Sequence, residues 1–177
     1  SNAYDTKGLL IQSIRDNDPV IFLEHKNLYQ DQADVPEEPY AIPFGEANVA
    51  REGKDLTIVT YGQMVKRSLE AADALSKNGI EAEVIDLRSI SPIDMDTVIE
   101  SVEMTGRCLC VDEANPRCSI ASDVSAKVAE EAFGALKGPI RMVTAPHAPV
   151  PFTPSLEDVY TPSSDEIVKV ATSMVKG

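Results

Sequence analysis

Two acidic residues, Asp112 and Glu113, directly follow a predicted buried strand at residues 107–111. Short apolar runs bounded by turn residues are typical of strands that lie inside a sheet. Open α/β sheets bind ligands at the edge formed by the carboxyl ends of their strands. The two carboxylates are therefore the best candidates for a polar binding site, and capping of the following loop and helix is the alternative interpretation.

The chain contains only two histidines, His25 and His147. His25 follows a predicted strand at residues 20–24, and His147 lies in a proline-rich stretch. Imidazole titrates near neutral pH, so either side chain could carry protons. No Ser/His/Asp set, P-loop or zinc-protease motif accompanies them, and the sequence therefore favours hydrogen bonding at a surface or an interface.

The three cysteines offer little chemistry. Cys108 and Cys110 are two residues apart on a strand and share one face, as a metal or redox pair would. They have neither CxxC spacing nor histidine partners, which favours small buried hydrophobic residues. Cys118 has no neighbouring His or Asn and is a weak candidate nucleophile. An odd, clustered set of cysteines predicts no disulfide framework and favours a reducing, cytoplasmic location.

The first predicted strand ends in the turn Tyr61-Gly62-Gln63-Met64. A dinucleotide site needs three glycines at such a turn, so that the backbone can approach the pyrophosphate. Only one glycine is present. Asp86 does end the second strand, at the position where an acidic residue binds the ribose of NAD. The sequence indicates a simple tight turn rather than an NAD site.

Charge and hydropathy exclude two classes of partner. The chain has 16 basic and 29 acidic residues, a formal net charge of −13, and no concentrated basic stripe. Such a surface repels phosphate backbones, so no nucleic acid partner is expected. No apolar run approaches the roughly 18 residues of a membrane span, so no membrane partner is expected either. A basic protein surface would be attracted, although acidity often serves solubility alone.

Strands and helices alternate from about residue 55 onward. The expected strands are 56–61, 82–87, 107–111 and 140–143, and apolar stripes predict helices at 65–75, 95–102, 120–132 and 167–174. Ser91-Pro92 is expected to begin the second helix, and residues 163–166 form a capping box for the last. This alternation implies right-handed crossovers and an α/β fold, a three-layer α/β/α sandwich with a mostly parallel sheet.

The remaining segments do not follow this alternation. Residues 1–3 are typical of the remnant of a cleaved expression tag. Residues 4–30, with a helix at 5–15, cannot bury the faces of a lone helix and strand unaided, so they either dock on the main sheet or belong to a domain whose remainder is missing. The missing domain is the favoured interpretation. Residues 31–54 form an acidic linker, residues 55–177 form the α/β domain, and the prolines at 145–154 predict an extended surface loop.

Several short segments resemble, in the same order along the chain, segments of one known family. They are DTKGLL at 5–10, IRDNDPVIFLE at 14–24, LY at 28–29, YAIPFG at 40–45, REGKDLTIV at 51–59, EVIDLR at 83–88 and PID at 92–94. The first three resemble the end of the pyrimidine-binding domain of the β subunit of a thiamine diphosphate-dependent 2-oxo acid dehydrogenase E1 component. The others resemble that subunit's C-terminal, transketolase-type domain.

The resemblance implies an α2β2 enzyme in which this chain meets an E1 α subunit, a second β subunit and the lipoyl acyltransferase core, E2. Thiamine diphosphate with magnesium is held between the α subunit and the β subunit's N-terminal domain in such enzymes, and a two-carbon fragment passes to lipoyl-E2. By the resemblance, the cofactor glutamate and the active-site histidine of such subunits would lie upstream of Tyr4. We therefore expect no catalytic or cofactor-binding residue in this chain, which would serve assembly and E2 docking and be inactive alone.

The resemblance also implies positions for a metal and for interfaces. A structural potassium ion would contact the segment that contains Ser13, Ile14, Asp16 and Asp18. Many family members carry an acidic residue near the E2-binding surface where this chain has Lys137-Gly138. The remaining interface candidates are Asp112, Glu113, His147, Glu157, Asp158, Asp165 and Glu166.

Substrate and class have alternatives. Residues 144–152 are similar to the acetoin-cleaving branch, and residues 115–118 replace a glycine-rich string of pyruvate-type subunits, which favours acetoin over pyruvate or a branched-chain 2-oxo acid. One alternative is a module that only docks partners. The other is a piece of a different transketolase-group enzyme, such as transketolase or deoxyxylulose-phosphate synthase, which should carry basic residues at the sheet's carboxyl edge.

Overall fold

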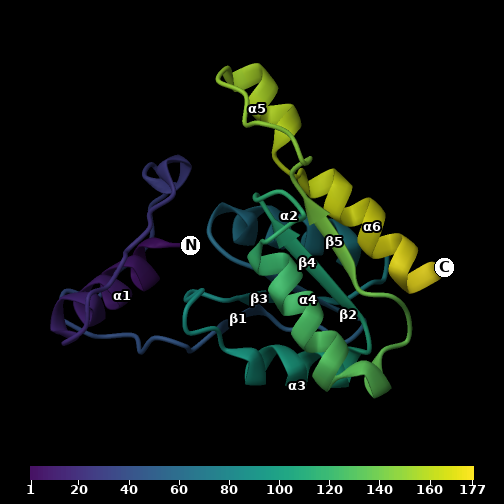
Figure 1. The fold of residues 1–177 in the computed structure, drawn as a ribbon, viewed down its shortest axis with the longest axis horizontal. Helices are drawn as coiled ribbons and strands as arrows, with labels where there is room; N and C mark the ends of the chain where they lie inside the picture. The colour runs from purple at the N-terminus through teal and green to yellow at the C-terminus, as the bar shows by residue number, and fades with distance from the viewer.

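The computed structural model describes residues 1–177 and contains one five-stranded sheet (Figure 1). Its strands are β1 (Asn48–Arg51), β2 (Leu56–Thr60), β3 (Ala82–Asp86), β4 (Cys108–Asp112) and β5 (Arg141–Thr144), in the order β1-β3-β2-β4-β5. β1 pairs antiparallel with β3, and all other neighbours are parallel. Every residue of β2, β3 and β4 is buried, as expected for parallel strands covered on both faces.

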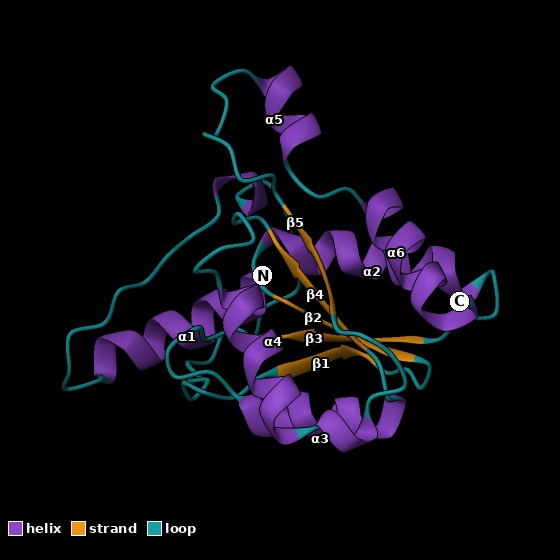
Figure 2. Cartoon of the chain, turned by 45° about the vertical axis from the view of Figure 1, so that its right-hand side comes forward, coloured by secondary structure: helices purple, strands orange, loops and turns teal.

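Helices cover both faces of the sheet (Figure 2). α2 (Gln63–Ser76) and α6 (Ser164–Lys176) pack with Ile58 and other residues of one face, and α3 (Met95–Thr105) and α4 (Ile120–Glu131) pack with Val59 and residues of the other. Successive strand residues point to opposite faces, so neighbouring apolar residues serve two separate cores. The predicted three-layer α/β/α sandwich is confirmed.

The predicted start of α3 is wrong. Ser91-Pro92 is a cis peptide before the helix, which begins at Met95 with Asp94 as its N-cap. The Asp94 carboxylate accepts from the Thr97 N–H at 3.1 Å and from the Ala47 N–H at 2.8 Å. Partial burial alone would raise the pKa of Asp94, but these donors and the Thr97 hydroxyl hold it below its usual value.

Three further predictions need correction. Residues 20–24 form no strand, because no neighbouring strand pairs with them. β1 lies inside the range predicted as a linker and completes the sheet's edge beside β3. A helix, α5 (Pro154–Tyr160), follows the proline-rich loop. Pro154 stands in its first turn, where a missing N–H breaks no helical hydrogen bond.

The first 43 residues lie beside the sandwich and contain α1 (Ala3–Arg15) and the 3-10 turn η1 (Lys26–Leu28). The C-terminal side of α4 is extended by a second 3-10 turn, η2 (Phe133–Ala135). α1 packs against Ile42 at Gly8, where a Cβ atom would come within 2.6 Å of the Ile42 side chain. Asp5 is buried and pairs with Arg88, just after β3, at 2.6 Å. None of the helices combines the length and apolar character needed to cross a membrane.

Candidate functional site

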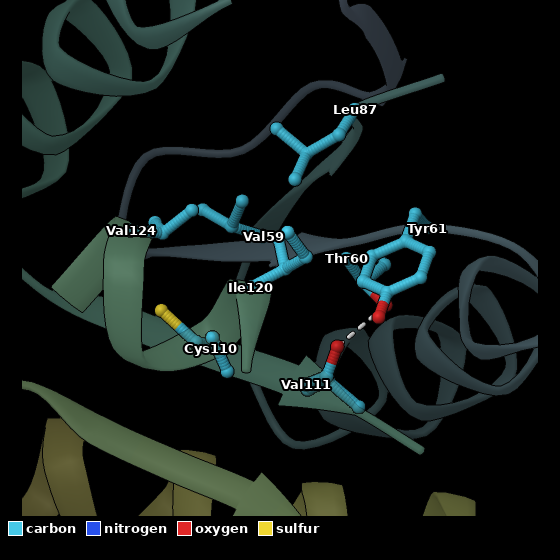
Figure 3. Close-up of a pocket in the computed structure, with 9 residues that line it drawn as sticks. Val59, Thr60, Tyr61, Leu87, Cys110, Val111, Ile120 and Val124 are labelled. Atoms are coloured by element: carbon cyan, nitrogen blue, oxygen red, sulfur yellow. Dashed lines mark hydrogen bonds between the residues drawn. The ribbon is translucent and has the colours of Figure 1, made fainter. Parts of the chain in front are cut away.

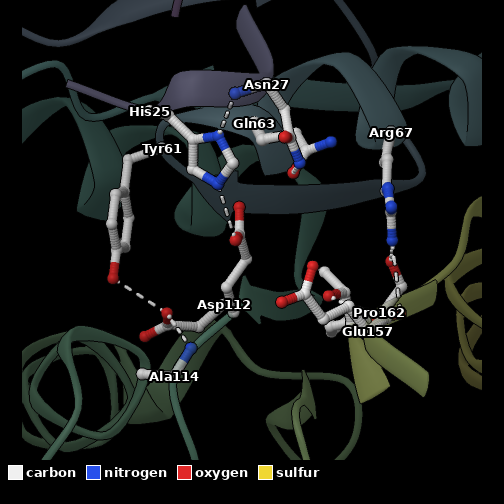
Figure 4. A network of polar contacts seen from close by, with 11 residues as sticks. His25, Asn27, Tyr61, Gln63, Arg67, Asp112, Ala114, Glu157 and Pro162 are labelled. Carbon is white, nitrogen blue, oxygen red and sulfur yellow. Dashed lines mark hydrogen bonds and ion pairs between the residues drawn. The ribbon is translucent and has the colours of Figure 1, made fainter. Parts of the chain in front are cut away.

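The carboxyl end of β4 is held by the buried side chain of Asp112 (Figure 4). One carboxylate oxygen accepts from the Tyr61 hydroxyl at 2.8 Å and from the Ala114 N–H at 2.9 Å, and the other accepts from the Ala121 N–H at 3.2 Å. Burial and the Asp112 charge raise the pKa of Tyr61, so the phenol stays a donor. Asp112 thus caps the loop and helix that follow it, which was the alternative interpretation of this residue.

Glu113 pairs with His25, 88 residues earlier in the chain, at 2.9 Å (Figure 4). The other ring nitrogen of His25, Nδ1, accepts from the Asn27 N–H at 3.3 Å. The tautomer that fits both contacts has its proton on Nε2, which donates to Glu113, and leaves Nδ1 as the acceptor. Both ring nitrogens are thus engaged in contacts within the chain.

These contacts lie at the topological switch point of the sheet. β2 continues through α2 to β3 on one side, whereas β4 continues through α4 to β5 on the other side and over the opposite face. The crevice between such strand ends is the usual ligand position in open α/β folds. Here the chain's own residues lie across it: His25 contacts Glu113 after β4, and the Asn27 side chain donates to Gln63 at the start of α2 at 3.3 Å.

Glu113 and His25 are separate candidates in the sequence, but their contact is not predicted from it, and neither is the place of Tyr61 and Gln63 at this edge. One available signal was the position of Tyr61 and Asp112, each at the end of a predicted parallel strand. Nothing in the sequence predicts that His25 lies at this edge. The strand predicted before it, at residues 20–24, is not part of the sheet and so could not indicate its position.

The residues of this edge do not fit a diphosphate. Two carboxylates, Asp112 and Glu113, stand at the end of β4. Arg67 donates to the carbonyl oxygens of Thr161 and Pro162, and its guanidinium is thereby committed to the segment after α5 (Figure 4). No group of three or more His, Cys, Asp or Glu side chains is placed to hold a metal ion.

A small apolar cavity lies under Tyr61, between β2, β4 and α4 (Figure 3). Eight of its nine lining residues are hydrophobic, and the hydroxyl of the remaining one, Thr60, donates to the Val111 carbonyl at 2.9 Å. This lining offers no free polar group to orient a ligand. Cys110 contributes to the wall.

Cys108 and Cys110 are buried in the core on the α3 and α4 side, as predicted, with their sulfurs 3.8 Å apart and no bond between them. The contact with Cys110, followed by burial, raises the pKa of the Cys108 thiol. Cys118 is exposed in the loop before α4. The two core thiols thus act as small hydrophobic residues.

The remaining interface candidates are exposed and dispersed. His147 lies in the loop after β5, Glu157 and Asp158 lie on α5, and Asp165 and Glu166 lie in the first turn of α6. α5 has no buried residue, and Figure 1 shows it projecting from the sandwich. Apolar side chains around it are also exposed, namely Val150, Phe152, Leu156 and Val159.

The residues predicted to contact potassium lie at the end of α1. The Ser13 hydroxyl donates to the Leu9 carbonyl at 2.7 Å, and the Asp16 carboxylate accepts from the Asp18 N–H at 3.0 Å. Ile14 is 75% exposed. The potassium site stays a prediction.

The profile of the family described as "Transketolase, C-terminal domain" matches residues 45–167. The chain belongs to the transketolase C-terminal domain family. The match begins just before β1 and ends in α6, so the family domain includes the sheet and leaves out α1.

Similarity to individual proteins extends over the whole of this transketolase-type chain and not only over the family domain. It is 66% identical, over all of its 177 residues, to the β subunit of acetoin:2,6-dichlorophenolindophenol oxidoreductase from Cupriavidus necator. It is 53% identical over 175 residues, 99% of its length, to the protein of that name from Bacillus subtilis, and 49% identical over 177 residues, again 99% of its length, to the pyruvate dehydrogenase E1 β subunit of the same species. It spans about half of each relative, namely 52%, 51% and 54%.

A solved structure described as a split-gene transketolase, an inactive β4 tetramer, is also similar. The TM-score is 0.64 and the identity 30%, over 80% of this chain and 47% of that one. It shares the α/β fold described above.

Proposed function

We propose that this chain is the C-terminal half of the β subunit of an acetoin-cleaving, thiamine diphosphate-dependent E1 enzyme of the cytoplasm. The observation that carries the proposal is similarity over the whole chain, at 66% and 53%, to two acetoin oxidoreductase β subunits. Within Bacillus subtilis, the acetoin subunit is more similar than the pyruvate subunit, 53% against 49%. The resemblance of residues 144–152, at the end of β5 and in the loop after it, to the acetoin-cleaving branch supports the same assignment.

In this proposal the half-subunit serves assembly rather than the chemical step. Thiamine diphosphate supplies the carbon chemistry where the complete enzyme holds it, and this half contributes a packed sheet and exposed surfaces. The carboxylates at the end of β4 support this division, because they would repel a diphosphate. They also disfavour a sugar-phosphate enzyme, which would need basic residues at that edge.

A segment exchange tests the proposal. Residues 1–177 replace the matching half of the Cupriavidus necator β subunit, and the hybrid is purified with the E1 α subunit. We expect acetoin-dependent reduction of dichlorophenolindophenol at a rate close to that of the parent. The same exchange into the Bacillus subtilis pyruvate dehydrogenase β subunit is the control. A hybrid that assembles with the α subunit but does not act on acetoin would contradict the proposal.

We further propose that E2 docks on the acidic surface of α5 and α6. Two exposed acidic pairs lie on these helices: Glu157 and Asp158 on α5, and Asp165 and Glu166 in the first turn of α6. Reversing the charge of either pair in the hybrid should weaken E2 binding by about tenfold at low salt and less at high salt. Glu103→Lys, on α3, is the matched control. Unchanged E2 affinity in both reversed variants would exclude this surface.

The potassium site at the end of α1 is proposed from the family resemblance. Asp16 and Asp18 supply oxygen atoms suited to a hard cation. Potassium, compared with sodium at equal ionic strength, should slow amide exchange in α1, and Asp16→Ala should abolish the difference. Equal exchange in both salts would refute the site.

A further inference from the structure

Residues 25–31 cross the carboxyl edge of the sheet and bind both sides of the switch-point crevice. His25 contacts Glu113 at 2.9 Å, beyond β4. The Asn27 side chain donates to Gln63 in the first turn of α2 at 3.3 Å, and Lys66, one turn along that helix, donates to both Asp31 oxygens at 2.9 Å. Three polar contacts therefore connect this segment to two separate elements of the domain.

Apolar burial does not hold the segment in place. η1 contains no buried residue, and neighbouring apolar side chains face outward: Leu23 is 75% exposed and Tyr29 is 59% exposed. Phe22 and Leu28 are only half-buried, so the segment depends mainly on its polar contacts. Among these, the His25 and Glu113 side chains are the least exposed pair, at 31% each, compared with 55% and 39% for Lys66 and Asp31. Exposed ion pairs contribute little, so the His25 contact dominates.

His25 suits this position because it bonds in two directions at once. Its Nδ1 caps η1 by accepting from the Asn27 N–H, and its Nε2–H donates to Glu113. One side chain thus both shapes the turn and fixes it to the sheet. Only the neutral imidazole provides an acceptor and a donor together.

We propose that residues 25–31 form a strap that occupies the ligand crevice of this sheet, and that His25 is the positioning residue that seats it. The strap is an intrachain ligand: it fills the place where open α/β sheets bind small molecules. It fixes the chain that precedes the linker against the domain, as a second attachment besides the pair of Asp5 with Arg88. The proposal goes beyond the proposed function and does not depend on it.

Amide exchange and trypsin cleavage of the 177-residue chain test the strap. Lys26 is exposed within η1, so cleavage after it reports release of the strap. His25→Ala and Glu113→Ala should each raise the exchange rate of residues 25–31 and the Lys26 cleavage rate by about three- to tenfold, the effect of losing one or two hydrogen bonds. Exchange in β2 and β4 should stay unchanged, which verifies that the variants fold.

Glu113→Gln is the matched control, because its amide oxygen still accepts from Nε2–H; its rates should stay within about twofold of the native chain. The double variant His25→Ala with Glu113→Ala should be no more open than His25→Ala, since that single variant already loses the Glu113 contact together with the cap of η1. Native-like exchange in His25→Ala would overturn the proposal. Effects of the two alanine variants that add in the double variant would overturn it as well.

Discussion

Replacement of Asp112 by Asn separates a supporting carboxylate from a free binding group. The Asn oxygen can still accept from Tyr61 and Ala114, but its NH2 group then faces the Ala121 N–H, which the carboxylate accepts at 3.2 Å. One hydrogen bond to a charged group is lost and a buried N–H is left without a partner, at a cost of about 2–3 kcal/mol. For a chain of this size, this corresponds to a fall in Tm of about 5–10 °C.

Urea unfolding followed by circular dichroism measures this cost. Tyr61→Phe removes one of the three hydrogen bonds and keeps the carboxylate, so it should cost less, about 1–2 kcal/mol. The double variant should cost less than the sum of the two single variants, because Asp112→Asn already weakens the charge-assisted hydrogen bond that Tyr61→Phe removes. An Asp112→Asn chain within about 0.5 kcal/mol of the native chain would refute the supporting role, since surface changes have effects of that size.

Three other predictions concern single positions. Asp94→Ala should lower the free energy of unfolding by about 1–2 kcal/mol at neutral pH. Because the pKa of Asp94 is lowered in the folded chain, this stabilisation is present above the pKa of the unfolded state and is lost as the pH falls through the pKa of the folded state. The stabilities of the native chain and of Asp94→Ala should therefore converge in acid unfolding experiments. Alkylation of the folded chain, followed by mass spectrometry, should modify one thiol per chain, and no thiol in Cys118→Ser. Alkylation of the Cys118→Ser chain would contradict the burial of Cys108 and Cys110. Gly53→Ala should lower the free energy of unfolding by about 3 kcal/mol, because its Cβ atom would lie 2.1 Å from the Glu83 backbone nitrogen. In Gly134→Ala the Cβ atom meets no other atom, so this variant should keep the native midpoint of thermal unfolding. Equal midpoints for the two variants would contradict this.

The order of the sheet elements was predictable because each has a strong local pattern. β2, β3 and β4 are short segments rich in β-branched and other apolar residues and are buried throughout, and the helices between them have regular apolar stripes. β1 was missed because its pairing with β3 depends on a contact more than thirty residues away. The start of α3 was misplaced because Pro92 fits a first helical turn by type, whereas the hydrogen bonds of Asp94 decide the boundary.

The candidate site was only partly predictable for the same reason. Asp112 and Glu113 were found because the end of a strand is a local feature of the sequence. The partner of Glu113, His25, comes from a segment without regular structure, and its position depends on long-range polar contacts that no periodicity encodes. α5 was missed because four prolines in its neighbourhood indicate a loop, although Pro154 occupies a helix position that tolerates proline.

In the proposed function this chain serves assembly and positioning, while the rest of the complete enzyme holds the coenzyme. The most direct measurement is acetoin-dependent reduction of dichlorophenolindophenol by the purified 177-residue chain with thiamine diphosphate, magnesium and the E1 α subunit. The claim predicts no reduction above the rate without protein, alongside full activity of the segment-exchange hybrid. Turnover by the 177-residue chain with the α subunit would contradict it.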